Sequence, residues 1–200
     1  MAERRTQAER SDATRLALTD ATVELLVERG WAATTAVAVV DRAGVTRGAL
    51  LHHYAGRAEL IAAALQQLYD SFDTERITPT SLHETLDEMW AVIGDIAFKA
   101  VIEAWLAAGN DCELEQTLGP VISNFAKLVH PDEHLGFATD SDHRAEVATF
   151  VLAARETMFG LALGRATAGR ALPHEAQVLA HLHDQATRLD ATRVTDDTRP

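Results

Sequence analysis

Cysteine is nearly absent from this sequence: Cys112 is the one cysteine among 200 residues. A single cysteine excludes a disulfide framework within the chain and is typical of a reducing compartment. Long apolar runs are absent too. Residues 1–15 are polar, which argues against a secretory signal. No stretch approaches the roughly 18 uninterrupted apolar residues of a membrane span. We therefore expect a cytoplasmic protein with no membrane partner.

Basic residues are also scarce, with 18 lysines and arginines against 30 acidic residues and a net charge of −12. The deficit is uneven. Residues 1–57 carry eight arginines and seven carboxylates, a net of +1, whereas the remainder carries ten basic and 23 acidic residues, a net of −13. Opposite signs suggest that the N-terminal part meets an anionic partner. A chance asymmetry of a solvated surface explains so small an excess equally well.

Strand-like alternation is missing, and the abundant Ala, Leu, Glu and Arg favour helix almost throughout, so we expect an all-α fold. An apolar content of 47% suffices for a core in a chain of this length. Capping residues, glycines and prolines predict helices at residues 12–29, 36–43, 47–54, 57–74, 81–98, 99–108, 111–129, 142–168 and 173–189. We expect a flexible arm at 1–11, a loop at 130–141 and a disordered tail at 191–200.

The second and third predicted helices are short and are joined by Ala43-Gly44-Val45-Thr46, a spacing typical of a helix-turn-helix. Gly44 can adopt a positive φ, and Thr46 can cap the helix predicted at 47–54. Residues 42–56 contain two arginines, two histidines and a tyrosine but no carboxylate. Phosphates would repel carboxylates, whereas Arg and His donate to base edges. This acid-free strip therefore predicts a helix that enters the major groove of DNA.

The residues predicted to contact DNA lie on or beside these two helices. Arg47 and His52 are expected to contact bases, while Gly48 leaves room for the wall of the groove. The residues expected to contact phosphates are Thr35, Thr46, His53, Tyr54 and Arg57.

From Arg15 to Leu60 the chain resembles the N-terminal domain of TetR-type transcriptional regulators. The matching pieces are Arg15, Leu18, Ala21, Leu25-Leu26, Glu28, Gly30, Thr34-Thr35, the run from Arg42 to Thr46, Gly48, Leu51, His53-Tyr54 and Glu59-Leu60. Thr22, Val39-Val40 and Arg57 depart from the usual residues of the family. The resemblance implies a three-helix DNA-binding domain at 12–56 and a larger helical domain at 57–190 that binds an effector and forms a homodimer. It implies a repressor that a small molecule releases from a palindromic operator.

Aromatic residues and methionines of the later helices can line an effector cavity or simply fill the core. Few basic residues accompany them, so we expect a neutral or lipophilic effector, although Asp95, Glu103 and Glu156 could receive a cation. The pocket candidates are Met89, Trp90, Phe98, Trp105, Phe125, Phe150 and Met158.

The helix predicted at 142–168 is apolar on more than one face, which requires two partners. Burial within one subunit can provide both. A four-helix interface, with two helices from each chain, would satisfy the pattern better. The interface candidates are Leu152, Phe159, Gly160, Leu163, Gly164, Leu179 and Leu182.

Histidines suggest a competing interpretation. His130-Pro-Asp-Glu-His134 matches the H-x-x-E-H pattern of some zinc peptidases. Pro131 predicts a loop there, so we expect no metal, no catalytic site and no cofactor. The alternatives are a helical enzyme or carrier with histidine-bound zinc or heme, and a helical adaptor that binds only protein. Metal or colour retained through purification, without DNA binding, would favour the enzyme.

Overall fold

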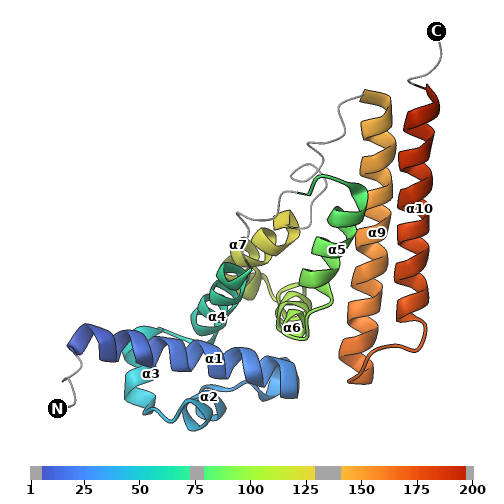
Figure 1. Ribbon diagram of the computed structural model, residues 1–200. Helices are drawn as coiled ribbons and strands as arrows, with labels where there is room; N and C mark the ends of the chain where they lie inside the picture. The colour runs from blue at the N-terminus through green and yellow to red at the C-terminus, as the bar shows by residue number, and fades with distance from the viewer. Residues whose placement is uncertain (1–5, 73–78, 129–140, 197–200) are drawn as a thin grey trace, which may run out of the picture. The chain divides into compact units, whose positions relative to one another are not determined.

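Every regular element in the described part of the chain is an α-helix. The computed structural model describes residues 6–72, 79–128 and 141–196. The helices in these ranges are α1 (Gln7–Ala33), α2 (Ala36–Ala43), α3 (Arg47–His53), α4 (Arg57–Ser71), α5 (Leu82–Ile93), α6 (Phe98–Ala108), α7 (Cys112–Leu128), α9 (Ser141–Ala168) and α10 (Glu175–Asp196), as Figure 1 shows. The predicted all-α class is confirmed.

The helices group into two compact units. The amino-terminal unit comprises Met1–Phe72 and Lys99–Phe125, and the carboxyl-terminal unit comprises Asp73–Phe98 and Ala126–Pro200. Most of α6 and α7 therefore packs with α1 to α4, although both helices follow α5 in the chain. The predicted boundary after residue 56 does not coincide with this division, because α4 packs along α1 in the same unit.

Threonine hydroxyls cap the amino ends of the two short helices. Thr35 Oγ1 accepts a hydrogen bond from the Ala38 amide at 3.2 Å, and Thr46 Oγ1 accepts one from the Ala49 amide at 3.2 Å. Such caps satisfy amides that have no partner inside the helix. The starts of α2 and α3 are therefore encoded locally.

Both ends of the chain are more helical than predicted. α1 begins at Gln7, inside the expected arm, because Thr6 and Glu9 form a capping box. The Thr6 amide donates to Glu9 Oε2 at 2.6 Å, and the Glu9 amide donates to Thr6 Oγ1 at 3.2 Å. α10 extends to Asp196, into the expected disordered tail, because each added helical residue gains a backbone hydrogen bond. The predicted loop at 130–141 lies outside the described residues except for Ser141, where α9 begins.

α5 is shorter than predicted. It ends at Ile93 rather than near Phe98, because the chain turns at Gly94, whose amide donates to the Trp90 carbonyl at 2.8 Å. A Cβ atom at Gly94 would lie 2.6 Å from Trp90 atoms, so this turn requires glycine. α6 begins at Phe98.

A single apolar core holds α1, α2, α3 and α4 together. Leu18, Val39, Leu50 and Leu60 belong to it, and each is at most 2% exposed. Burying one such side chain is worth about 1.5–3 kcal/mol. Thr22 is also buried, and its hydroxyl donates to the Leu18 carbonyl at 2.7 Å. Core packing therefore determines where α3 stands on α1.

Two side chains of α6 hold the carboxyl end of α1. The helix breaks at Gly30, where φ is 77° and ψ is −179°, a conformation open essentially to glycine alone. Just beyond the break, the Trp31 amide donates to Glu103 Oε2 at 2.8 Å. Just before it, Lys99 Nζ donates to the Val27 carbonyl at 2.6 Å. The break exposes backbone groups, and α6 supplies partners for them.

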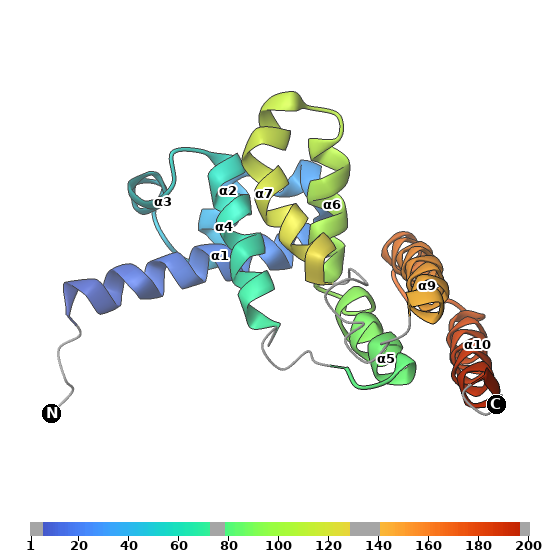
Figure 2. The ribbon, with the colours of Figure 1, turned by 90° about the horizontal axis from the view of Figure 1, so that it is seen from above.

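In the carboxyl-terminal unit α9 and α10 run antiparallel side by side, and α5 contacts both (Figures 1 and 2). α9 buries a stripe at helical spacing that includes Val147, Val151, Ala154 and Met158. Among the described helices, the segment His143–Ala168 is long and apolar enough to cross a membrane. This is weak evidence, because core helices of many proteins meet the same criteria.

Candidate nucleic-acid interface

The turn between α2 and α3 has helix-turn-helix geometry. Gly44 adopts the left-handed conformation, with φ 65° and ψ 31°, and its amide bonds back to the Val40 carbonyl. The Val45 amide also donates to the Val40 carbonyl at 3.1 Å, and the Val45 side chain packs against the core. The positive φ at Gly44 reverses the chain within four residues, as the sequence predicts.

α3 divides its side chains between the core and the surface. Leu50 is 2% exposed, whereas Arg47 and His52 are exposed and His53 is half-buried. A Cβ atom at Gly48 would meet only Thr46 Oγ1, at 3.8 Å, so the surface beside Arg47 is open. A cation, an imidazole and a bare stretch of backbone thus share one exposed helix, which suits entry into a major groove.

The capping threonines remain able to bind phosphate. Each hydroxyl accepts a backbone hydrogen bond at the start of its helix, and both Thr35 and Thr46 are exposed. A hydroxyl that accepts one hydrogen bond still has its own proton to donate. The amino ends of α2 and α3 also carry partial positive charge. Phosphate contacts by these two threonines fit the geometry and stay a prediction.

The strip at 42–56 is acid-free in the sequence but not in space. Arg42 Nη2 lies 2.6 Å from Glu28 Oε2, and Arg42 Nη1 lies 2.8 Å from Glu24 Oε2, so two carboxylates of α1 hold this arginine. The hydrogen bond from Arg42 lowers the pKa of the Glu28 carboxyl below its usual value. A lowered carboxyl pKa stabilises the fold at neutral pH, and this contribution fades as the pH falls through that pKa. Arg42 therefore ties α2 to α1.

Tyr54 was predicted to contact DNA phosphates, but its side chain is buried. It is 7% exposed, belongs to the core and ends α3. Its hydroxyl is buried, so the predicted phosphate contact does not fit this geometry. An amphipathic tyrosine can bury its ring and keep a wet hydroxyl, and only packing decides between the two arrangements.

Arg57 lies at the start of α4 and is held by Trp31. Its guanidinium lies 4.3 Å from the centre of the Trp31 ring and donates to the Trp31 carbonyl. Burial lowers the pKa of Arg57 below its usual value. The predicted phosphate contact stays a prediction. Trp31 was not among the predicted site residues, and its only signal in the sequence is its position directly after Gly30.

The predicted effector residues do not form one cluster in either unit. Trp105 and Phe125 belong to the amino-terminal unit, where Trp105 is 54% exposed and the Phe125 ring packs on Tyr69 and Phe72. The other five belong to the carboxyl-terminal unit. There the Phe98 ring lies 5.5 Å from that of Phe159. Met89 and Met158 are buried, Phe150 is half-buried, and the Arg165 guanidinium lies over the Trp90 ring at 5.5 Å.

The predicted dimer residues differ in exposure. On α9, Leu152 is 37% and Leu163 is 45% exposed, and Gly160 is exposed beside open space. Gly164 instead faces its own chain, because a Cβ atom there would lie 2.6 Å from Leu172 Cδ1. On α10, Leu182 is 8% exposed and Leu179 half-buried, while Phe159 packs on Phe98. The structure therefore leaves Leu152, Gly160 and Leu163 available to a second chain.

Histidines do not form a metal site in the part of the chain that the structure describes: no group of three or more His, Cys, Asp or Glu side chains there could hold an ion. His183 lies 3.2 Å from Asp87, and the His83 and His183 rings lie 5.3 Å apart. The peptidase-like pattern of His130 and His134 falls outside the described residues.

Residues 18–64, which contain much of α1, all of α2 and α3 and the start of α4, match the family model for bacterial regulatory proteins of the tetR family. Over these residues the chain has the DNA-binding domain of the TetR family. It is a transcriptional regulator with a helix-turn-helix, and the relatives it matches are regulators rather than enzymes.

Relatives of this chain match it over longer stretches. An uncharacterised HTH-type transcriptional regulator of Mycobacterium tuberculosis, Rv2912c, is 28% identical over 134 residues, which cover 63% of this chain and 69% of that one. The HTH-type transcriptional regulator CymR of Pseudomonas putida is 32% identical over 123 residues, which cover 57% of this chain and 60% of that one. The structure of the multidrug binding protein EbrR complexed with malachite green gives a TM-score of 0.60 at 20% identity, covering 88% of this chain and 96% of that one. The fold that this chain shares with EbrR therefore extends beyond the DNA-binding domain.

Proposed function

We propose that this regulator acts in the cytoplasm as a homodimeric repressor that binds a palindromic operator and is released by a small molecule. The observation that carries DNA recognition is α3. It presents Arg47 and His52 outward beside Gly48, where a Cβ atom would meet nothing closer than 3.8 Å. Arg47 and His52 would contact bases, while His53 and the capping threonines of α2 and α3 would position the helix on phosphates.

Dimerisation is supported by the exposed apolar part of α9. Leu152 and Leu163 stand exposed on a helix whose Gly160 leaves room for close approach of another helix. Pairing α9 and α10 with the same helices of a second chain would bury these leucines in a two-fold four-helix interface. A two-fold dimer reads a palindrome, because its two recognition helices enter successive major grooves about 34 Å apart.

A small-molecule effector is supported by a relative in fold. EbrR is described as a multidrug binding protein, and its structure contains malachite green. In this chain Met89 and Met158 are buried in the same unit that holds the aromatic pair Phe98 and Phe159. Methionines form adaptable apolar walls. These features favour a neutral or lipophilic effector.

Control of DNA binding would pass through the end of α1. Lys99 and Glu103 of α6 bond to backbone atoms on either side of Gly30, and Arg57 of α4 holds Trp31. A displacement of α6 would therefore pull on both helices that carry the helix-turn-helix. An effector produces that change only if it binds the non-DNA arrangement more tightly.

The test is to incubate the purified full chain with fragmented genomic DNA and to sequence the fragments it retains. We expect enrichment of a sequence with two-fold symmetry whose half-sites are centred about one helical turn apart. Arg47→Ala serves as the matched variant, because it removes one base contact and leaves the caps of α3 in place. Retention of random sequence, with the same fragments bound by Arg47→Ala, would contradict the proposal.

A further inference from the structure

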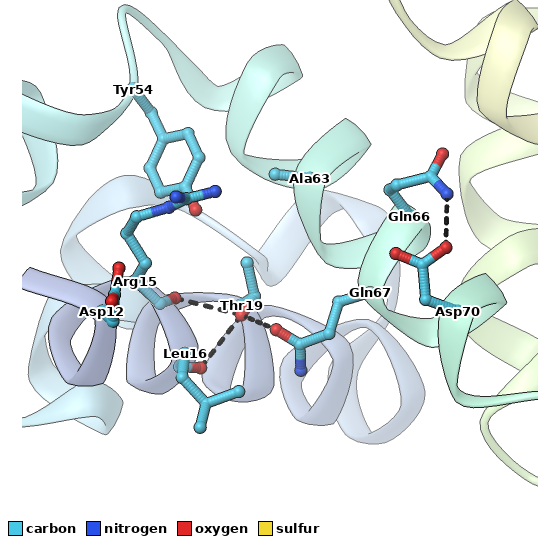
Figure 3. Close-up of a pocket in the computed structure, with 9 residues that line it drawn as sticks. All are labelled: Asp12, Arg15, Leu16, Thr19, Tyr54, Ala63, Gln66, Gln67 and Asp70. Carbon is cyan, nitrogen blue, oxygen red and sulfur yellow. Dashed lines mark hydrogen bonds between the residues drawn. The ribbon is translucent and has the colours of Figure 1, made fainter. Parts of the chain in front are cut away.

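A pocket of about 330 Å³ opens between α1 and α4 within the amino-terminal unit. This volume lies at the lower end of the range of small-molecule sites, about 300–1,000 Å³. The lining consists of Asp12, Arg15, Leu16, Thr19, Tyr54, Ala63, Gln66, Gln67 and Asp70 (Figure 3). None of these is among the predicted effector residues, so the pocket is a separate feature of the DNA-binding part.

The Tyr54 hydroxyl gives the pocket an unpaired donor. Tyr54 is 7% exposed, and within the described residues its hydroxyl has no hydrogen-bond partner although it is buried. Buried polar groups in native proteins are nearly always hydrogen-bonded, so an exception calls for a missing partner.

Arg15 supplies a second donor at the same place. Figure 3 shows its side chain extending from α1 toward the hydroxyl end of the Tyr54 ring. Its guanidinium makes no hydrogen bond and no ion pair within the part of the chain that the structure describes. A guanidinium can donate two parallel hydrogen bonds to one carboxylate.

The remaining polar groups of the pocket are mostly engaged with each other. The Thr19 hydroxyl donates to Gln67 Oε1, and Gln67 Nε2 donates to Asp20 at 2.6 Å. Gln66 Nε2 donates to Asp70 at 2.8 Å. Asp12, exposed at the wall, is the one carboxylate here without such a partner among the described residues. The pocket therefore has two donors without acceptors, the Tyr54 hydroxyl and the Arg15 guanidinium, among the described residues.

We propose that this pocket binds a small organic carboxylate, which accepts hydrogen bonds from Arg15 and Tyr54 and lays its apolar part against Leu16 and Ala63. A free molecule fits better than an operator phosphate, because no residue of α3 lines the pocket. The bound carboxylate bridges α1 and α4, the two long helices on which α2 and α3 are mounted, and so stabilises the folded DNA-binding unit. The site does not depend on the proposed effector or on repression.

The experiment is a nuclear magnetic resonance titration of the ¹⁵N-labelled full chain with acetate, hexanoate and benzoate at constant ionic strength. Benzamide, which resembles benzoate but is neutral, is the ligand control. We expect saturable shifts for amides of residues 12–19 and 63–70, and roughly tenfold weaker binding of benzamide, because the charge-assisted hydrogen bonds are lost. No saturation by any of the three carboxylates up to ~10 mM, ten times the dissociation constant of a weak ~1 mM ligand, would overturn the proposal.

Two variants and a control assign the binding to the pocket. Tyr54→Phe removes a hydroxyl without a protein partner and so leaves the fold intact, and Arg15→Gln removes the cation. Each should weaken carboxylate binding by roughly tenfold. Arg29→Gln makes the same change on the same helix outside the pocket and should leave it unaltered. Shifts that persist in Arg15→Gln would mean adventitious surface binding. Shifts of these amides produced by DNA and by no carboxylate would assign the donors to phosphate; either result overturns the proposal.

Discussion

Three arginines of the DNA-binding unit show how environment gives one residue type different roles. Arg42 is neutralised by two carboxylates of α1, and Arg57 lies over the Trp31 ring. Arg47 is exposed on α3 with no hydrogen bond or ion pair inside the described part of the chain. An arginine without internal partners can donate two parallel hydrogen bonds to the O6 and N7 atoms of a guanine edge. Among these three, Arg47 is the residue suited to base recognition.

Replacing Arg47 by alanine should therefore reduce sequence preference. We expect Arg47→Ala to weaken specific operator binding by about 1–3 kcal/mol and to bring operator and random DNA closer in affinity. Competition binding at fixed salt measures both effects. Arg29→Ala, also an exposed arginine but on α1, controls for the loss of one positive charge. If Arg47→Ala and Arg29→Ala behave alike, α3 is not the recognition helix.

At the scale of elements, the break of α1 at Gly30 matters most. It lets one helix end where the side chains of α6 can reach its backbone. The conformation is one that residues with a Cβ atom rarely adopt, and a Cβ there would approach the Glu103 carboxylate oxygens to 3.1 Å. One glycine thus provides both a backbone conformation that would strain other residues and a contact between α1 and α6.

Gly30→Ala should destabilise the fold by about 1–3 kcal/mol through backbone strain alone. Chemical denaturation followed by circular dichroism measures the change. Gly48→Ala is the matched control, since Gly48 lies in α3 beside open space and alanine there should add about 0.5–1 kcal/mol of stability. Equal stability of the Gly30→Ala chain and the wild type would mean that α1 can straighten through residue 30.

At the scale of the whole molecule, the exposed apolar residues of α9 and the proposed two-fold operator both call for a symmetric dimer. Gly160 and Gly164 lie one helical turn apart on α9 but have different surroundings. Gly160 borders open space, and Gly164 packs against Leu172 of its own chain. The sequence predicted both glycines at the dimer interface, and tertiary packing gives Gly164 a partner within its own chain instead.

Leu163→Glu should disrupt the dimer, because the interface would bury an unpaired charge. Light scattering at micromolar concentration should show a wild-type dimer and a mutant monomer. Leu106→Glu is the control, since Leu106 on α6 is 53% exposed against 45% for Leu163. A wild-type monomer would rule out the assembly, and equal loss of dimer in both variants would rule out α9 as its specific interface.

Induction requires that operator and effector weaken each other's binding by the same factor. A ~100-fold loss of operator affinity corresponds to ~2.7 kcal/mol of coupling, so saturating operator should raise the effector dissociation constant ~100-fold. Titration of a compound found to release operator, followed by tryptophan fluorescence with and without DNA, measures this. Equal affinity under both conditions would exclude release by coupled binding, even for a DNA-binding dimer.

Much of the helix-turn-helix could be predicted from local signals. Thr35 and Thr46 cap the helices that follow them, and Gly44 adopts the positive φ that the turn needs. Each depends on a residue and its neighbours within four positions, so the printed sequence contains the whole interaction. The early start of α1 was equally local, because Thr6 and Glu9 have the spacing of a capping box.

The sequence by itself determined the all-α class, the turn and the exposed polar character of α3. Only the tertiary structure decided which side chains are free to bind a partner and which are held by other residues of the chain. Arg42 meets Glu24 and Glu28 across two helices, Arg57 meets Trp31, and the Tyr54 hydroxyl enters a pocket between α1 and α4. The physical reason is range: capping and helix propensity act along a few residues of chain, whereas ion pairing, ring stacking and burial depend on neighbours that are distant in the sequence.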